Sequence, residues 1–281
     1  MEKITLNNGV EMPILGLGVY QIDDLAVCQQ TVSDALEVGY RLVDTAAVYE
    51  NEVAVGAAIK ESGIKREELF IQSRLWIQDF GYDAALKGFD KSMQKLGLDY
   101  IDLYMLHKPY NDYYGAWRAL ERLYKEGRIR AIGVTSFWNE RLADFCHFNE
   151  IIPAVNQVET NVWWQQWPAN EYMKSKGIQH QTWAPFAEGF QDVFTNETLQ
   201  KIAAKHGKTT AQVMLRFFIE RGISVIPKTT HKERLIENFN VFDFSLYDED
   251  MAQIKTLDYG YSILSDDHDL NEALGMIEYT F

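Results

Sequence analysis

The chain has little cysteine and no long apolar run, and both absences narrow what it can be. Its two cysteines, Cys28 and Cys146, are too few for a disulfide framework or a thiolate metal site. No apolar stretch approaches the roughly 20 residues that span a bilayer, and the first residues, Met1-Glu2-Lys3, do not form a signal-peptide pattern. We therefore expect a cytoplasmic protein with no metal site and no membrane partner.

Basic charge is also scarce. The sequence holds 27 lysines and arginines against 41 aspartates and glutamates, which gives a net charge of −14. A field of this sign repels nucleic acid, so we expect no nucleic-acid partner. An anionic ligand must then be held by a local basic cluster. Such a cluster lies near the C-terminus, where Lys228 and Arg234 lie beside the last predicted helix.

No proline- or serine-rich linker divides the 281 residues, and a hydrophobic fraction of 47% is enough for one full core. Instead, short apolar runs alternate with helical patterns along the chain. The strands are predicted at about residues 14–18, 42–43, 69–74, 100–107, 129–134, 154–158, 178–183 and 223–226. The helices are predicted at about 27–38, 53–61, 86–96, 117–124, 140–148, 169–175, 198–205, 209–220 and 232–239, before a polar, acidic tail.

This order of elements predicts the fold class. Residues 4–6 and 10–12 alternate around Asn8-Gly9, which predicts an N-terminal β-hairpin with a type I′ turn. Eight strands, each followed by a helix, in this length are the pattern of a (β/α)8 barrel, an α/β fold also called a TIM barrel. A doubly wound sheet fits less well, because the run Gly16-Leu17-Gly18 lacks the third glycine of the dinucleotide fingerprint.

Residues 41–52 contain the first candidate site. A buried strand ends at Asp44, and Tyr49 follows one loop later. Asn51 is placed to cap the next helix, whose apolar face is predicted to start at Val53. An isolated pair of this kind is more often a turn cap and a packed ring. However, most of the residues at the ends of the predicted strands are polar or aromatic, and strand ends are where barrel enzymes have their chemistry. These residues are Gly18, Asp44, Arg74, His107, Thr135, Ser136, Gln157, Trp183 and Lys228.

Several segments resemble the aldo-keto reductase family, from about residue 4 to about residue 258. They are Leu-Gly-Leu-Gly-Val-Tyr (15–20), Val-Asp-Thr-Ala-Ala-Val-Tyr-Glu-Asn-Glu (43–52), Leu-Gly-Leu-Asp-Tyr-Ile-Asp-Leu-Tyr-Met-Leu-His (96–107), Gly-Arg-Ile-Arg-Ala-Ile-Gly-Val (127–134), Val-Asn-Gln-Val-Glu (155–159) and Ile-Pro-Lys-Thr-Thr-His-Lys-Glu-Arg-Leu-Ile-Glu-Asn (226–238). The resemblance implies an NADP-dependent oxidoreductase that reduces small aldehydes or ketones to alcohols. We expect a monomer with one domain over residues 1–281, whose tail, residues 259–281, borders the substrate pocket.

The resemblance also implies catalytic roles. Asp44, Tyr49 and His107 fall on three of the family's four catalytic positions, and Arg74 falls on the fourth, where the family has lysine. Tyr49 would donate a proton to the carbonyl, and His107 would orient that carbonyl. Arg74 would ease the loss of the proton while Asp44 holds the cation. A phenol has a pKa near 10, so we expect the cation to bring it toward neutrality.

The cofactor and substrate residues follow from the same resemblance. Lys228 and Arg234 suit a 2′-phosphate, which favours NADP(H) over NAD(H). Trp183 would stack on the nicotinamide, and its carboxamide would be held by Gln157 with Thr135 and Ser136. The other implied cofactor residues are Gly18, Val19, Ala184, Phe186, Thr229, Thr230, His231 and Asn238. The implied substrate residues are Tyr20, Trp76 and Lys108, with Trp163 or Trp164 as further aromatic candidates.

Three functions are open from the sequence. The leading one is carbonyl reduction. The second is a nucleotide-binding regulatory protein whose turnover is weakened by Arg74 and by Ser136, a position where the family commonly has asparagine. Arg74 is either the natural residue or an engineered substitution. This chain also has Lys108 where the family frequently has tryptophan, and Ala184 where the family frequently has serine. The third is a barrel hydrolase with paired carboxylates, which is disfavoured because Asp44 pairs with a cation and the basic cluster would go unused.

Overall fold

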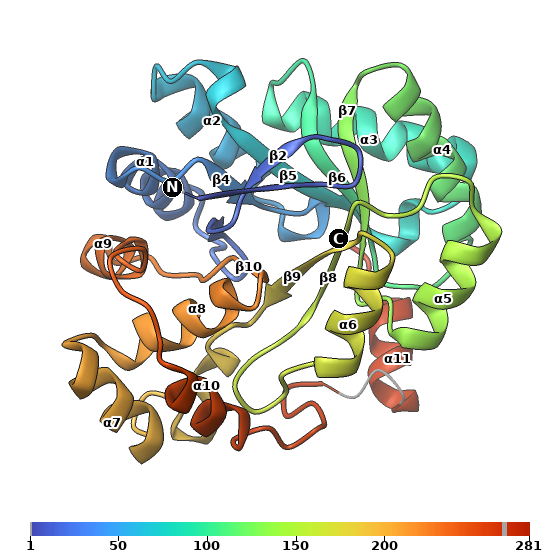
Figure 1. Ribbon diagram of the computed structural model, residues 1–281. Coiled ribbons are helices and arrows are strands. Elements are labelled where there is room, and N and C mark those ends of the chain that lie inside the picture. The colour runs from blue at the N-terminus through green and yellow to red at the C-terminus, as the bar shows by residue number, and fades with distance from the viewer. Residues whose placement is uncertain (1, 266–268) are drawn as a thin grey trace.

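The computed structural model describes residues 2–265 and 269–281. Eight parallel strands pair in the order β10-β9-β8-β7-β6-β5-β4-β3. A parallel bridge between Leu15 and Val225 joins the two ends of this sheet, and the Gly16 N–H donates to the Val225 carbonyl at 2.9 Å. Figure 1 shows helices ranged around the outside of the strands. The predicted (β/α)8 fold and the N-terminal hairpin are confirmed.

The elements follow one another in the alternation that the sequence predicts. The strands are β1 (Lys3–Thr5), β2 (Glu11–Pro13), β3 (Leu17–Gly18), β4 (Leu42–Asp44), β5 (Phe70–Leu75), β6 (Ile101–His107), β7 (Ile129–Thr135), β8 (Val155–Glu159), β9 (Gln179–Trp183) and β10 (Ser224–Val225). The helices are α1 (Leu25–Val38), α2 (Glu52–Glu61), α3 (Tyr82–Leu96), α4 (Tyr113–Lys125), α5 (Asn139–Phe148), α6 (Trp167–Ser175), α7 (Glu197–His206), α8 (Thr210–Glu220), α9 (Lys232–Phe239), α10 (Asp248–Lys255) and α11 (Leu270–Glu278). Short 3₁₀ turns are η1 (Ala47–Tyr49), η2 (Arg66–Glu68), η3 (Ile77–Asp79) and η4 (Ala187–Asp192).

The hairpin turn differs from the prediction. Strands β1 and β2 pair with Ile4 opposite Met12, and the Gly9 N–H donates to the Leu6 carbonyl at 2.9 Å. Gly9 has a positive φ of 85° but Asn8 does not, so the type I′ turn, which needs both, is wrong. The loop has three residues instead of two, and the Asn8 side chain donates to the Arg130 carbonyl at 2.9 Å, which fixes the loop at the amino end of the barrel.

Two apolar cores hold the barrel together. The larger one lies between the strands and the surrounding helices, where side chains such as Trp117, Phe145 and Phe217 are completely buried. The smaller one fills the barrel beneath the hairpin, where Met12 packs with Leu103 and other strand residues. Burying large side chains in this way is the main force that closes such a fold. None of the helices in the described part of the chain is long and apolar enough to cross a membrane.

The tail contains structure that the sequence pattern did not predict. Helix α10 lies within the segment taken as a polar tail, and α11 follows, with the Asp269 side chain accepting from Asn271 N–H at 2.9 Å as its N-cap. None of the residues of α11 is buried. The helix is held by its cap and by a hydrogen bond from the Gln78 side chain to the Ile277 carbonyl at 2.5 Å, and a search for buried apolar faces detects neither. Residues 266–268 of the predicted tail lie outside the described residues.

Asp102 on β6 ties the amino end of the barrel together. It is fully buried and accepts from the Ile71 N–H at 2.8 Å, from Arg66 at 2.7 Å and from Arg130 at 2.7 Å. We expect Asp102→Ala to lower the free energy of unfolding by about 3 kcal/mol, because it leaves these donors unpaired. Asp99→Ala, at an exposed position, is the control and should change it by less than about 0.5 kcal/mol. Equal urea midpoints for the two variants would refute this role for Asp102.

Candidate active site

The parallel register brings the predicted strand-end residues together. Asp44 ends β4, His107 ends β6 and Thr135 ends β7. His107 is paired directly with Thr135, which is paired in turn with Gln157 of β8. Because the eight strands are parallel, these positions lie at the carboxyl end of the barrel, opposite the hairpin. The location that the sequence predicted for the site is therefore occupied by the residues it named.

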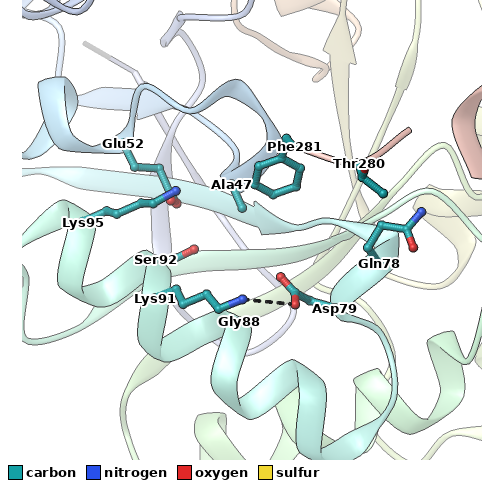
Figure 2. Close-up of a pocket in the computed structure, with 10 residues that line it drawn as sticks. All are labelled: Ala47, Glu52, Gln78, Asp79, Gly88, Lys91, Ser92, Lys95, Thr280 and Phe281. Carbon is teal, nitrogen blue, oxygen red and sulfur yellow. Dashed lines mark hydrogen bonds and ion pairs between the residues drawn. The ribbon is translucent and has the colours of Figure 1, made fainter. Parts of the chain in front are cut away.

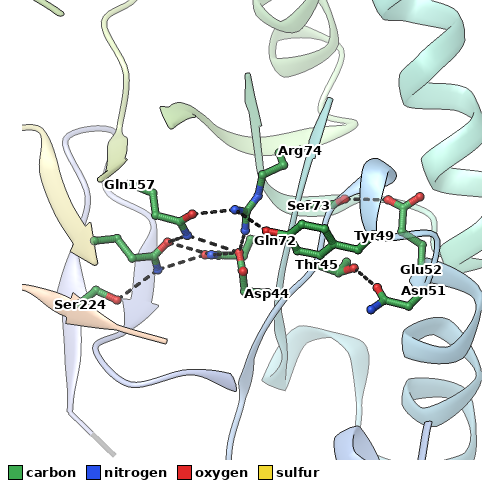
Figure 3. Close-up of polar contacts among 11 residues, drawn as sticks. Asp44, Thr45, Tyr49, Asn51, Glu52, Gln72, Ser73, Arg74, Gln157 and Ser224 are labelled. Atoms are coloured by element: carbon green, nitrogen blue, oxygen red, sulfur yellow. Dashed lines mark hydrogen bonds and ion pairs between the residues drawn. The ribbon is translucent and has the colours of Figure 1, made fainter. Parts of the chain in front are cut away.

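Arg74 is the centre of the polar network at this end (Figure 3). Its side chain is buried, and Nη2 pairs with Asp44 Oδ1. Nη1 donates to Gln157 Oε1 at 2.7 Å and to the Tyr49 hydroxyl at 3.3 Å. Arg74 therefore clamps Asp44 and lies closer to Gln157, the predicted nicotinamide residue, than to the predicted acid.

Two glutamines that the sequence pattern did not single out complete the network. Gln72 Nε2 donates to Asp44 Oδ1 at 2.5 Å and to Gln181 Oε1 at 2.8 Å. Gln157 Nε2 donates to the same Gln181 oxygen at 2.8 Å. The available signal was strand alternation, because Gln72 lies two residues before Arg74 and so shares its face of β5. This glutamine layer fixes the carboxylate that in turn fixes the cation.

The loop that carries Tyr49 is held by a buried amide. Asn51 precedes α2, but its side chain does not cap that helix as predicted. Its Nδ2 instead donates to the Val19 carbonyl at 2.9 Å, and its Oδ1 accepts from the Thr45 hydroxyl at 2.7 Å. Val53 is 51% exposed, so the buried face of the helix does not start there either. Asn51 therefore ties the Tyr49 loop to the end of β3.

The protonation states follow from burial and charge. Burial raises the pKa of the Tyr49 phenol above its usual value, and Arg74 acts against this without cancelling it. The expected fall of this pKa toward neutrality is wrong for the present arrangement. For Arg74, burial opposes the charge, but Asp44 and Tyr49 outweigh it and the pKa is raised. Burial, together with Arg74 and Lys108, lowers the pKa of His107 well below its usual range, so the imidazole is neutral at neutral pH.

Aromatic rings lie beside Tyr49 and His107. The Tyr20 ring lies 4.9 Å from the Tyr49 ring, and the Trp76 ring lies 5.0 Å edge-on from His107, measured between centroids. Trp76 Nε1 donates to the Tyr279 carbonyl at 3.2 Å, so the tail reaches this wall. Tyr20 is 49% exposed, which leaves the site open on that side. The arrangement suits a carbonyl compound with one apolar end.

Three residues with a left-handed backbone conformation lie at the carboxyl end of the barrel. Lys108, Ser136 and Ala184 directly follow β6, β7 and β9 and have φ angles of 86°, 55° and 51°. This conformation is uncommon for residues with a Cβ atom, and such strain collects at functional sites. Asparagine, which the resemblance leads us to expect at position 136, tolerates it better than serine does. The substitution at Ser136 therefore affects the backbone as well as the hydrogen-bond donors.

A second group of predicted residues lines a cavity of about 230 Å³ beside α9. The predicted cofactor residues among its lining are Phe186, Lys228, Thr229, Arg234 and Asn238. Phe194, Thr209 and Glu237 also line it and were not predicted. Thr230 and His231 are not among the lining residues; the His231 N–H instead donates to Thr229 Oγ1 at 3.1 Å, just before α9. Two cations beside a helix N-terminus suit a phosphate group.

The residues between these two regions fit a nicotinamide. Thr135 Oγ1 and His107 Nδ1 are both buried without a partner in the part of the chain that the structure describes. Orphaned polar atoms at a predicted site are what a ligand would satisfy. Gln157, by contrast, has its Oε1 taken by Arg74. A carboxamide at this position could form a hydrogen bond with the unpaired Thr135 hydroxyl. It would have to compete with Arg74 for the Gln157 side chain.

Other predicted residues have plainer surroundings. Gly18 lies where β3 meets β10, and a Cβ there would come within 2.9 Å of the Ile226 carbonyl oxygen. Val19 is buried, and Trp183 is half-buried at the end of β9. The Trp163 ring is buried and stacks on Tyr259 at 5.2 Å. Trp163 thus anchors the start of the tail.

The fold and the site together define a (β/α)8 barrel in which a buried Asp44–Arg74 pair contacts the Tyr49 phenol at the carboxyl ends of the strands. The family model named "Aldo/keto reductase family" matches residues 15–258. A glyoxal reductase of Bacillus subtilis is 47% identical, with 91% of this chain and 92% of that protein covered. A solved aldo-keto reductase from a deep-sea metagenome library is 44% identical with a TM-score of 0.92, covering 96% and 99% of the two chains. A Bombyx mori aldo-keto reductase solved in complex with NADP is 33% identical with a TM-score of 0.88, covering 95% of each chain. The chain belongs to the aldo-keto reductase family, which confirms the resemblance.

Proposed function

We propose that this protein reduces aldehydes and ketones to alcohols with NADPH, and that small 2-oxoaldehydes are among its good substrates. The observation that carries the proposal is the contact of the Tyr49 hydroxyl with Arg74, which is itself paired with Asp44. His107 stands beside this group with its ring centroid 6.1 Å from that of Tyr49. The similarity to a protein named glyoxal reductase supports the choice of substrate class.

Bound NADPH would supply the hydride that the carbonyl carbon takes up. Tyr49 donates the proton that the carbonyl oxygen takes up, and Arg74 stabilises the phenolate that remains. Neutral His107 donates a hydrogen bond that orients the carbonyl, since its lowered pKa leaves one ring nitrogen protonated. Asp44 holds Arg74, and the glutamines hold Asp44. Trp76 and Tyr20 form the wall against the rest of the substrate.

The cofactor is proposed to run from Thr135 to the cavity beside α9. In this proposal Trp183 would stack on the nicotinamide, and Gly18, Val19, Ser136 and Ala184 would also contact the cofactor. At the other end, Lys228 and Arg234 are both lining residues of one cavity, where they would hold a 2′-phosphate. The Bombyx mori relative was solved with NADP, which supports the choice of cofactor.

We expect Arg234→Ala to weaken NADPH binding about tenfold or more and to leave NADH binding nearly unchanged. A charged hydrogen bond to the 2′-phosphate is worth roughly 1.5–3 kcal/mol, and NADH lacks that group. Lys232→Ala removes the same charge from the same helix, but Lys232 pairs with Glu37 at 2.6 Å, so it serves as the control. Equal losses for both cofactors on titration, or an equal loss in the control, would contradict the assignment.

Turnover separates this function from the regulatory alternative. We would follow NADPH oxidation with glyoxal-type, sugar-derived and aromatic aldehydes and measure NADPH binding in parallel. The proposal expects binding together with aldehyde-dependent oxidation. Tight binding without turnover across the series would favour a nucleotide-binding regulator, for which the close Arg74–Gln157 contact is the specific support.

We also propose a cytoplasmic monomer with one domain over residues 1–281. Its tail, residues 259–281, would border the substrate pocket. The hydrogen bonds from Trp76 and Gln78 to the Tyr279 carbonyl, at 3.2 and 3.3 Å, support this position of the tail. Light scattering of the purified protein tests the oligomeric state: a mass near 32.5 kDa is expected, and twice that mass would overturn it.

A further inference from the structure

Five buried side chains inside the barrel form a closed hydrogen-bonded network. Arg74 pairs with Asp44 and donates to Gln157 at 2.7 Å (Figure 3). Gln157 donates to Gln181 at 2.8 Å. Gln181 and Gln72 exchange two hydrogen bonds, at 2.8 and 3.2 Å, and Gln72 donates to Asp44. The contacts therefore return to the residue where they start. We call this set the five-residue network: Asp44, Gln72, Arg74, Gln157 and Gln181.

The two charged members fix the direction of the hydrogen bonds in this network. A carboxylate only accepts, so Gln72 presents its amino group to Asp44. The same amino group also donates to Gln181, whose side-chain oxygen therefore accepts. A guanidinium only donates, so Gln157 presents its oxygen to Arg74 and its amino group to Gln181. Both charged groups thus require the same orientation of all three amides.

Gln181 holds Gln157 in this orientation. Its Oε1 accepts from Gln72 and from Gln157, both at 2.8 Å, and its Nε2 donates to Ser224 Oγ of β10 at 3.2 Å. Without the Gln181 oxygen, the Gln157 amino group would keep only a long contact of 3.4 Å with Asp44. A buried donor left without a partner costs about 1–3 kcal/mol. The present orientation of Gln157 would then no longer be the favoured one.

The orientation of Gln157 decides how the Arg74 guanidinium is shared. Nη1 lies 2.7 Å from Gln157 Oε1 but 3.3 Å from the Tyr49 hydroxyl, and a hydrogen bond weakens as it lengthens. We propose that Gln181 is a positioning residue for the proton donor, because through Gln157 it holds the guanidinium away from Tyr49. Gln181 thereby limits the rate of carbonyl reduction. This role rests on the proposed function.

Arg74 is the member of the network that acts on the phenol as a cation. The titratable and charged groups that face Tyr49 among the described residues are Arg74, Asp44, Tyr20 and His107. The buried Glu52 carboxyl faces elsewhere: it lines a cavity of about 220 Å³ between α2, η3 and α3 (Figure 2) and accepts from the Ser73 hydroxyl at 2.7 Å. A change at Gln181 should therefore reach Tyr49 through Arg74.

Gln181→Met removes the shared acceptor and keeps an unbranched side chain of similar length. Arg74 is then expected to approach Tyr49, so kcat for aldehyde reduction should rise by about threefold or more. The alkaline limb of kcat should move to lower pH, because a closer cation favours the phenolate. Steady-state kinetics with one reactive aldehyde across a pH series measures both. An unchanged or lower kcat, or an unmoved limb, in a folded protein would refute the role of Gln181.

Gln179→Met is the matched control, because it makes the same change two residues earlier on β9. Gln179 donates to the Gly222 carbonyl at 2.8 Å and has no bond to the five-residue network. It should leave kcat and the alkaline limb as in the parent. A shift equal to that of Gln181→Met would show a general effect of losing a strand glutamine, against the proposal.

Two further variants separate positioning from a general effect on the fold. In Arg74→Lys the ammonium does not engage Gln157, so adding Gln181→Met should change kcat by less than about twofold. Gln181→Glu keeps an oxygen that accepts from Gln157. Its kcat should not rise and its alkaline limb should not move to lower pH. A rise in Gln181→Glu, or a threefold change in the Arg74→Lys background, counts against the proposal even where Gln181→Met fails to fold.

A crystal structure of Gln181→Met supplies a readout that does not depend on turnover. Arg74 Nη1 is expected nearer to the Tyr49 hydroxyl than to the Gln157 oxygen. Retention of the present order of distances would overturn the proposal. A parent protein that reduces no aldehyde would contradict the proposed function, and the crystal structure would still decide whether Gln181 positions Arg74.

Discussion

Replacing Tyr49 with phenylalanine is expected to lower kcat for aldehyde reduction by about 10²–10⁴-fold and to leave NADPH affinity unchanged. A positioned general acid contributes a factor of this size. The Tyr49 hydroxyl lies 3.3 Å from Arg74, the cation proposed to stabilise the phenolate that remains. Steady-state kinetics with one reactive aldehyde, together with NADPH titration, measures both quantities.

Tyr20→Phe is the matched control for this variant. Tyr20 is a neighbouring phenol whose ring lies 4.9 Å from that of Tyr49, but its side chain is 49% exposed. Among the described residues, the Arg74 guanidinium bonds Tyr49, Gln157 and Asp44 rather than Tyr20. The Tyr20→Phe protein should keep most of its kcat. A Tyr49→Phe protein that turns over any good substrate at near the parent rate would exclude Tyr49 as the acid.

Arg74→Lys is expected to raise kcat at least several-fold while NADPH still binds. In the present arrangement the guanidinium is shared: Nη2 pairs with Asp44, and Nη1 lies 2.7 Å from Gln157 but 3.3 Å from the Tyr49 hydroxyl. An ammonium is a compact point charge without this planar fork, so it can hold Asp44 and Tyr49 without engaging Gln157. Misplacing a catalytic contact by about 1 Å can cost about 10²-fold in rate.

The pH profile gives this prediction a second readout. Burial raises the pKa of Tyr49 above 10.0, with Arg74 acting only in part against it. The phenol therefore stays protonated through neutral pH, and loss of reduction at alkaline pH begins only as the pH rises through the raised pKa. A closer cation favours the phenolate, so this alkaline limb should move toward lower pH in Arg74→Lys.

Arg130→Lys is the control for an arginine-to-lysine change, because Arg130 pairs with Asp102 at the opposite end of the barrel. It should leave both kcat and the alkaline limb unchanged. If the Arg74→Lys protein is no faster than the parent at any pH, arginine at position 74 supports catalysis as well as lysine does. Its contact with Gln157 then does not slow the reaction.

The strand ends could be predicted from the sequence because a parallel barrel places them all at one edge. Asp44, His107 and Gln157 were predicted in this way; in the structure Asp44 is paired with Gln72 of β5, and His107 and Gln157 are both paired with Thr135 of β7. Gln72 and Gln181 were missed, although they hold Asp44 and Gln157, because a glutamine inside a strand carries no motif of its own. Only alternation along β5 points to Gln72. The layer beneath a site is thus less visible in a sequence than the site itself.

Features in which a tertiary contact opposes a local preference were the hardest to predict from the sequence. The sequence places a cation near Tyr49, but it does not show that burial outweighs that cation. In the same way, Asn8-Gly9 predicts a turn, but docking of Asn8 on the Arg130 carbonyl accompanies a three-residue loop. Asn51 was expected as a helix cap and instead bonds Val19 and Thr45. In each case a tertiary contact overrides a local preference.

Transfer of a label tests the central claim most directly. NADPH carrying deuterium at C4 of the nicotinamide would be mixed with the protein and a small 2-oxoaldehyde, and the product would be analysed by mass spectrometry. The account predicts an alcohol that carries one deuterium on the former carbonyl carbon, and a rate that falls by about 10²-fold or more in Tyr49→Phe. NADPH that binds but yields no labelled alcohol, or an aldehyde that is consumed without NADPH, would contradict it.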